Sequence, residues 1–304
     1  MRVIVTIKKG ELFAEKSFMV SGKRKRMDLK ITTLIENNSD DKGQLLYEHG
    51  LSLYIETDRK NILFDTGESG DFIKNAKSLH KNLNILDYCI LGHGHYDHSG
   101  GVEKFISEVD NVPQFIVGEE FFKPKYKTSD APGYKFNGNS FDEEFIAKKQ
   151  ISLRKVKEDM IYLTDHIIVF HHFSRYMDYE VRNSRFFIKE NDEFTPDNFD
   201  DEISLGIITK KGLVVIVGCS HVGIVNILKT ISKRVNIPIH AVIGGTHLIE
   251  ADEFRMKKTL DAFKDMKIQL IAVSHCTGKE GIRLISKELK EQFLYNNTGK
   301  VIEI

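Results

Sequence analysis

The stretch Leu91-Gly92-His93-Gly94-His95-Tyr96-Asp97-His98-Ser99-Gly100-Gly101, called the metal loop below, decides how the rest of the chain can be interpreted. It places three histidines and one aspartate within six positions, after an apolar run typical of a buried strand and before glycines where a helix can start. Imidazole and carboxylate groups are ligands that zinc and similar divalent cations prefer. On an extended or turning backbone His93 and His95 project to the same side, because side chains alternate along the chain. Asp97 and His98 follow a bend, so we expect them to face a second cation.

Composition bounds the classes of protein that this chain can belong to. It has 304 residues, and its 44 lysines and arginines balance its 44 aspartates and glutamates, so the formal net charge is zero. A broad electrostatic surface for nucleic acids is therefore not expected. Three widely spaced cysteines, Cys89, Cys219 and Cys276, suggest no disulfide framework and favour a reducing compartment. No apolar run reaches the roughly 18 residues of a membrane helix, and the first apolar run is too short for a signal peptide. These features predict a cytoplasmic protein.

The chain divides into an N-terminal extension, residues 1–26, and a core domain, residues 27–304. The extension ends in the basic cluster Lys23–Arg26, and we expect either a β-hairpin or a poorly ordered leader. Within the core domain, residues 119–200 are less regular than their surroundings. We expect an excursion with a few strands, of which Ile167–Phe170 is the clearest, and we expect it to shape a substrate pocket. Four residues of this excursion are expected to be ordinary loop residues, with substrate contact as the alternative: His171, His172, Arg175 and Tyr176.

Four predicted apolar strands each end in histidine. The histidines follow the runs Tyr88–Leu91, Leu213–Val217, Ile239–Ile243 and Ile268–Val273, and they are His93 with His95, then His221, His247 and His275. Ligands of open α/β sheets bind outside the carboxyl ends of the strands, so we expect these histidines to form one convergent site.

Two further residues stand at strand ends. Asp65 follows the predicted strand Ile62–Phe64, where it either caps the next segment or holds a ligand histidine. Cys219 precedes His221, and it is either an inert buried residue or a soft metal ligand.

These residues resemble a known family. His93-x-His95-x-Asp97-His98, with Asp65 at an earlier strand end, resembles the signature of the metallo-β-lactamase superfamily. Three later segments resemble a subgroup of metal-dependent hydrolases called β-lactamase superfamily II, some members of which are named dihydropterin ribofuranosyl-aminobenzene phosphate synthases. These segments are Gly218–His221, Gly244–Leu248 and His275–Gly278. The resemblance covers residues 27–304.

The resemblance implies an α/β fold, namely an αβ/βα four-layer sandwich of two mixed β-sheets with the site at one edge. It also implies a dinuclear centre. His93 and His95 are then expected to bind the first cation, and Asp97, His98 and His275 the second.

The sequence departs from the superfamily pattern at two positions where a metal ligand is expected. The superfamily usually adds one more histidine to the first cation and a bridging aspartate at a later strand end. Cys219 stands where that aspartate is expected, and Asp200, Asp201 and Glu202 stand where the histidine is expected. His221 is therefore our candidate for the missing first-metal ligand.

The resemblance and the metal chemistry together predict a hydrolase that uses a metal-bound hydroxide at a mono- or dinuclear site. The expected cofactors are two zinc ions, with iron or manganese as alternatives. Asp97 is expected to orient the hydroxide or accept its proton, and His247 to contact substrate or stabilise developing negative charge. Asp65 and Cys219 are expected to support the ligands. A small anionic or phosphorylated substrate is favoured because a cationic site attracts anions.

Three other functions remain open. The first is a synthase that condenses a pterin diphosphate with a ribofuranosyl-arylamine phosphate, forming a C–N or C–C bond. The second is a nuclease, which the neutral net charge disfavours. The third is a non-catalytic metal-dependent binding or sensor protein. Beyond a small-molecule substrate we expect neither a nucleic acid nor a membrane as partner, and homo-oligomer formation is left open.

Overall fold

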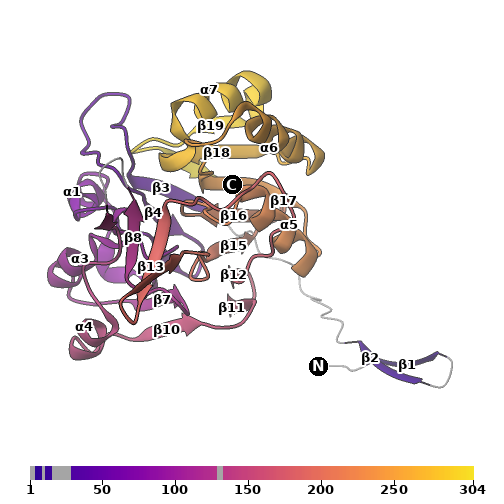
Figure 1. Cartoon of the computed structure of the whole chain (residues 1–304), viewed down its shortest axis with the longest axis horizontal. Helices are drawn as coiled ribbons and strands as arrows, with labels where there is room; N and C mark the ends of the chain where they lie inside the picture. The colour runs from indigo at the N-terminus through magenta and orange to yellow at the C-terminus, as the bar shows by residue number, and fades with distance from the viewer. Residues whose placement is uncertain (1–3, 9–10, 16–28, 129–132) are drawn as a thin grey trace.

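Two mixed β-sheets packed face to face form the centre of the molecule, and helices cover their outer surfaces (Figure 1). The computed structural model describes residues 4–8, 11–15, 29–128 and 133–304. Within these residues, none of the helices has the length and apolarity that a membrane span requires.

The first sheet has seven strands in the order β10-β7-β6-β5-β4-β3-β20. Its members β5, β6, β7 and β10 run parallel to one another, whereas β4, β3 and β20 join by antiparallel pairing. Parallel neighbours need crossover connections, and helices supply them here. The strands are β3 (Lys30–Ile35), β4 (Ser52–Glu56), β5 (Asn61–Phe64), β6 (Tyr88–Ile90), β7 (Gln114–Gly118), β10 (Leu153–Val156) and β20 (Val301–Glu303).

The second sheet also has seven strands, in the order β11-β12-β15-β16-β17-β18-β19. Its central strand β16 reads Leu-Val-Val-Ile-Val and is buried along its whole length, as expected for a β-branched apolar run covered on both faces. From β16 to β19 the strands are parallel. The strands are β11 (Met160–Thr164), β12 (Ile167–Phe170), β15 (Ser204–Ile208), β16 (Leu213–Val217), β17 (Ile239–Gly245), β18 (Leu270–Ser274) and β19 (Phe293–Tyr295).

Three buried apolar clusters define the layers. One lies between the two sheets, one between the first sheet and α1, α3 and α4, and one between the second sheet and α5, α6 and α7. The predicted four-layer αβ/βα sandwich is therefore confirmed. The α-helices are α1 (Asp71–Ser78), α2 (Tyr96–Ser99), α3 (Val102–Glu108), α4 (Glu143–Lys148), α5 (Ile224–Arg234), α6 (Glu253–Asp265) and α7 (Gly278–Leu289), and short 3-10 turns span Leu83–Ile85, His275–Thr277 and Lys290–Gln292.

Two smaller sheets complete the described structure. A four-stranded antiparallel sheet has the order β14-β13-β8-β9, with β8 (Lys125–Thr128), β9 (Tyr134–Phe136), β13 (Phe186–Glu190) and β14 (Glu193–Pro196). In the N-terminal extension β1 (Ile4–Lys8) pairs antiparallel with β2 (Glu11–Glu15). The basic cluster Lys23–Arg26 lies outside the described residues.

Much of the region expected to be an excursion belongs to the two main sheets. Within residues 119–200, β10 extends the edge of the first sheet, and β11 and β12 extend the edge of the second. The four-stranded sheet uses the remaining strands of this region. The chain ends in two short strands, of which β19 joins the second sheet and β20 the first.

Candidate metal centre

The predicted donor side chains gather at one edge of the molecule, where parallel strands of both sheets end. In the first sheet β5 ends just before Asp65, and β6 ends just before the metal loop. In the second sheet β16 leads to Cys219 and His221, β17 to His247 and β18 to His275. Side chains that follow the carboxyl ends of parallel strands share one edge of a sheet. Because the two sheets pack face to face, these edges meet, and the structure brings every predicted donor together.

One donor group consists of Asp97, His98, Cys219 and His275, all of them buried. His98 Nε2 lies 3.1 Å from Cys219 Sγ and 3.2 Å from His275 Nε2. Asp97 Oδ2 lies 3.1 Å from His275 Nε2 and 3.7 Å from His98 Nε2. Ligands about 2.0 to 2.3 Å from a tetrahedral zinc ion stand roughly 3.3 to 3.8 Å apart. Three of the four distances are slightly shorter than this range and one lies within it, so the four donors are close enough together to hold one cation.

A second donor group consists of His93, His221 and Cys219, with His95 beside it. His93 Nε2 lies 3.0 Å from His95 Nδ1, and the ring centre of His221 is 4.8 Å from that of His93 and 4.9 Å from that of His95. Both nitrogens of His221, Nδ1 of His93 and Nε2 of His95 are buried without a hydrogen-bond partner among the described residues. Buried polar atoms normally have a hydrogen-bond partner, so these unpartnered nitrogens fit the role of metal ligands. Cys219 belongs to both groups and lies between them.

The two histidines of the second group, and His95 beside it, favour the neutral form. Burial, reinforced by the neighbouring imidazoles, lowers the pKa of His93, His95 and His221 well below the ordinary value. A neutral imidazole is the form that binds a metal, because a protonated ring has no free lone pair. The apolar surroundings therefore prepare these side chains for a cation.

Charge in the first group is distributed differently. Burial opposes ionisation of Asp97, but His98 and His275 outweigh it and hold the pKa of Asp97 well below its usual range. Burial likewise opposes protonation of His98, but Asp65 and Asp97 outweigh it and raise the pKa of His98 to about 9. Asp65 is itself buried at the end of β5, where Oδ1 accepts from the Gly92 N–H at 2.6 Å and Oδ2 from His98 Nδ1 at 2.6 Å. These contacts turn Nε2 of His98 toward Cys219.

A buried lysine supports the other side of the metal loop. Lys125 Nζ lies 2.8 Å from an oxygen of Asp197 and 2.9 Å from one of Asp201. The second oxygen of Asp201 accepts from the Gly94 N–H at 2.7 Å. At Gly94 a side chain is excluded, because a Cβ would stand 2.4 Å from the Phe121 carbonyl oxygen. The loop is thus held between two carboxylates, Asp65 and Asp201.

The acidic run in place of the expected histidine supports ligands rather than facing the donors. Glu202 is buried and accepts from the backbone N–H groups of His221 and Val222, both at 2.8 Å. Asp201 pairs with Lys125, and the carbonyl of Asp200 accepts from His171 at 2.6 Å.

Four non-glycine residues at this edge have left-handed backbone conformations. Their φ angles are 60° at Asp65, 63° at Ser220, 48° at His247 and 51° at His275. Such conformations cost about 1 kcal/mol or more each outside glycine and asparagine. Local hydrogen bonds hold them: the Ser220 hydroxyl donates to the Gly245 carbonyl at 2.8 Å, for example.

His247 lies between the second donor group and a cavity of about 570 Å³. Its ring centre is 4.3 Å from that of His221, and both rings line the cavity. The remaining wall comes from residues 179–185 and 250–255.

The four candidate residues of the excursion lie elsewhere. Arg175 donates to the Val222 and Asn198 carbonyls, and His171 stacks on His172 with ring centres 3.9 Å apart. The cavity lining includes neither these residues nor Tyr176.

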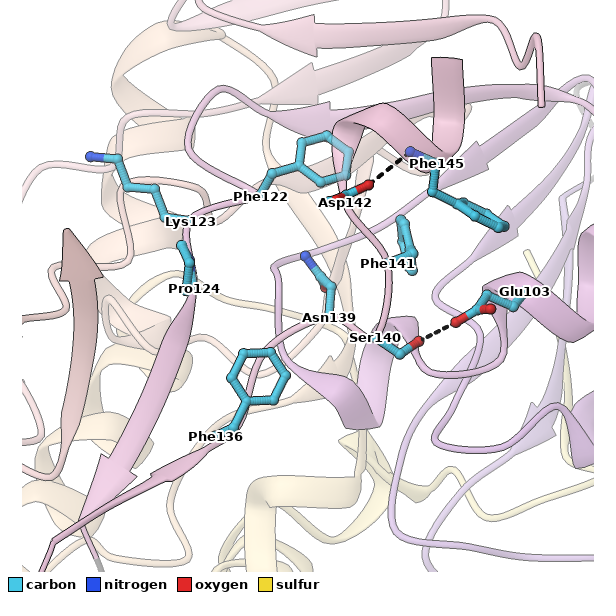
Figure 2. A pocket seen from close by; sticks show the side chains of 10 residues that line it. All are labelled: Glu103, Phe122, Lys123, Pro124, Phe136, Asn139, Ser140, Phe141, Asp142 and Phe145. Atoms are coloured by element: carbon cyan, nitrogen blue, oxygen red, sulfur yellow. Dashed lines mark hydrogen bonds between the residues drawn. The ribbon is translucent and has the colours of Figure 1, made fainter. Parts of the chain in front are cut away.

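A second cavity, of about 320 Å³, is lined by four phenylalanines together with polar residues (Figure 2). Asn139 in its wall accepts from the Ser99 hydroxyl at 2.7 Å, which links it to α2. Figure 2 shows Ser140 bonded to Glu103 and Asp142 capping the start of α4 at Phe145. None of the donor residues above lines this cavity.

Comparison with known proteins places the chain in a family. The sequence model of the Metallo-beta-lactamase superfamily matches residues 47–235, which include the metal loop, Cys219 and His221. The chain belongs to the metallo-β-lactamase superfamily.

Three similar proteins match nearly the whole of this chain. A 7,8-dihydropterin-6-methyl-4-(β-D-ribofuranosyl)-aminobenzene-5′-phosphate synthase of Methanocaldococcus jannaschii is 34% identical over 288 residues, covering 91% of this chain and 97% of its own. An uncharacterised protein of the same organism is 30% identical over 279 residues, covering 90% and 100%. The solved structure of Tm1679, described as a metal-dependent hydrolase of the β-lactamase superfamily, matches with a TM-score of 0.79 at 29% identity, covering 91% and 99%.

Some residues beside the donor groups were not predicted from the sequence. His49 Nε2 lies 3.3 Å from Asp97 Oδ2, and its ring centre is 5.0 Å from that of His275. Asn37 Oδ1 lies 2.8 Å from His275 Nδ1. Both come from the segment between β3 and β4, and His49 precedes a strand instead of following one. Cys276 forms a further donor group with Cys219 and His247. The order of ligands along the sequence contains no signal for these contacts.

Proposed function

We propose that this chain is a metal-dependent hydrolase that acts on a small phosphorylated substrate. One observation carries the proposal: two adjacent groups of buried imidazole, carboxylate and thiol donors share Cys219, and several of their imidazole nitrogens have no partner in the described part of the chain. Structural ion pairs do not leave such atoms unsatisfied. The similarity to Tm1679, which is described as a metal-dependent hydrolase, extends over nearly the whole of both chains and supports a hydrolase function.

We assign the ligands from these distances. His93, His95 and His221 hold one cation, and Asp97, His98 and His275 hold the other. Cys219 takes the place between them where an aspartate was expected, and as a soft ligand it suits zinc or iron. When bound, such cations lower the pKa of water to near 7 and polarise the substrate.

The remaining chemistry comes from side chains around the donors. Asp97 is ionised, and its Oδ2 is close to both His49 and His275, so it orients the attacking water and accepts its proton. His247 lines the cavity beside the donor His221, and there it contacts the substrate and stabilises negative charge that develops in the transition state. The cavity is within the size range of sites for small molecules.

Metal analysis combined with a substrate screen tests this proposal. The purified protein is expected to contain zinc, iron or manganese and to hydrolyse at least one compound in a panel of phosphate esters, lactones and thioesters. His95→Ala and Asp97→Ala are expected to lose metal and hydrolysis together. Protein that is isolated without metal, with the same activity in both variants, would refute it.

A second function is favoured by the similarity to the M. jannaschii synthase, which is the stronger of the sequence matches described above. In that case the bond between a pterin carbon and its diphosphate breaks, a bond to a ribofuranosyl-arylamine phosphate forms, and diphosphate and a proton leave. Turnover of this substrate pair, with none of the esters hydrolysed, would select the synthase. Both functions use the same ligands and a phosphorylated substrate.

A further inference from the structure

Three arginines line the cavity beside His221 and His247: Arg182, Arg185 and Arg255. Two come from the segment that precedes β13, and the third from the first turn of α6. The cavity therefore collects guanidinium groups from distant parts of the sequence next to the donor histidines. Tyr179, Asn183 and Ser184 add hydrogen-bonding groups to the same wall.

The carboxylates of this cavity are already engaged. Glu250 is bonded to Arg185 and to the Asn183 amide. Asp252 caps α6, where its Oδ1 accepts from the Arg255 N–H at 2.7 Å. Two carboxylates against three guanidinium groups leave an excess of positive charge.

Two of the arginines have N–H groups that are not paired with a carboxylate. Arg182 donates to the neutral Asn198 Oδ1 at 2.9 Å and makes no ion pair with any described residue. Nε of Arg255 is buried, and no hydrogen-bond acceptor faces it within the described ranges. A buried guanidinium N–H without an acceptor is costly, and the same arginine lines the cavity.

We propose that this cavity binds the phosphate group of a phosphate monoester and so directs the rest of the substrate to His247 and the donor groups. The proposal rests on the proposed function for the statement that the bound ester is the substrate. Guanidinium groups match phosphate oxygens in geometry and charge, and the three oxygens of a monoester can meet three arginines. A carboxylate offers only two oxygens, so it satisfies this wall less completely.

Binding of glycerol 3-phosphate to the metal-loaded protein, measured by calorimetry, tests the proposal, with glycerol as the unphosphorylated comparison. Arg182→Gln and Arg255→Gln are each expected to weaken binding about tenfold or more, since each removes a charged hydrogen bond. Arg283→Gln is the matched control, because Arg283 is exposed on α7 and pairs with Glu280; it is expected to bind as the wild type. Glu250→Gln is expected to bind more tightly, because Arg185 loses its competing carboxylate.

The outcomes separate this site from phosphate binding at the cations. Unchanged affinity in Arg182→Gln and in Arg255→Gln would overturn the proposal, and so would binding that His95→Ala abolishes and the arginine variants leave intact. Arg182 is exposed, so its variant carries the test if Arg255→Gln fails to fold. Metal content and ester hydrolysis are measured on the same preparations. Arginine-dependent binding by a protein with neither metal nor hydrolysis would leave the phosphate site standing and refute the proposed function.

Discussion

Asp65 Oδ2 accepts a hydrogen bond from His98 Nδ1 at 2.6 Å, which ties the end of β5 to the metal loop. Asp65→Asn keeps the size of the side chain but loses its charge and one acceptor. We expect metal affinity to fall by about 10- to 100-fold, the usual effect of removing the carboxylate behind a ligand histidine. Competition with a chelator measures it. Asp87→Asn is the control, because Asp87 pairs with Lys60 away from the donors; equal affinity in the two variants would contradict the assignment.

The position of Cys219 between the donor groups leads to a spectroscopic prediction. Cobalt bound to a thiolate shows a sulfur-to-metal charge-transfer band in the near ultraviolet. We expect this band in the cobalt-substituted wild type and in Cys89→Ala, whose thiol lies in the apolar core between the first sheet and its helices. Cys219→Ser is expected to lose the band. A band that persists in Cys219→Ser would assign the thiolate to Cys276 instead.

Lys125 provides a prediction about stability. It is buried against Asp197 and Asp201, and Lys125→Met leaves two buried carboxylates without their cation. Breaking a buried pair in this way costs about 3–5 kcal/mol of unfolding free energy. Lys60→Met, which removes a partly exposed pair with Asp87, is expected to cost about 0–1 kcal/mol. Urea unfolding compares the two, and similar losses would mean that the Lys125 cluster contributes no more than a surface pair.

Glu180 predicts a pH dependence. Burial raises its pKa above the ordinary value of 4.5, although its oxygens accept from the Val225 and Asn226 N–H groups. A raised pKa in the folded state means that the protonated form is favoured there. The resulting stability is present below about pH 4.5 and is lost as the pH rises through the folded-state pKa. Glu180→Gln lacks this dependence.

Urea unfolding of both proteins at a series of pH values from about 4 to 8 measures the effect. The unfolding free energy of the wild type, relative to that of Glu180→Gln, is expected to fall with rising pH. Two curves that stay parallel over this range would show that Glu180 has an ordinary pKa in the folded state.

The sandwich and its donor edge could be predicted because their signals are local. Apolar runs such as β16 identify buried strands, and each predicted donor follows such a run within a few residues. Since parallel strands end at a common edge, His221, His247 and His275 could be placed together without knowing any distance between them.

Other features depend on pairings that leave no local pattern. Lys125 meets Asp197 and Asp201 across 72 and 76 residues, and no local sequence pattern links residues that far apart. His49 reaches Asp97 from a segment that precedes a strand. The expectation that ligands follow the carboxyl ends of strands therefore does not predict it. The edge strands β10 and β11 are short and partly polar, and only their hydrogen-bonded partners in the sheets identify them.

The left-handed conformations at Asp65, Ser220, His247 and His275 imply a trade-off between thermal tolerance and chemistry. Glycine relieves the conformational penalty at such positions, while it removes a donor or its support. Laboratory evolution for heat resistance alone would therefore select glycine at these positions and produce more thermostable proteins with an impaired metal centre. A screen that couples heating to metal retention would protect these four positions.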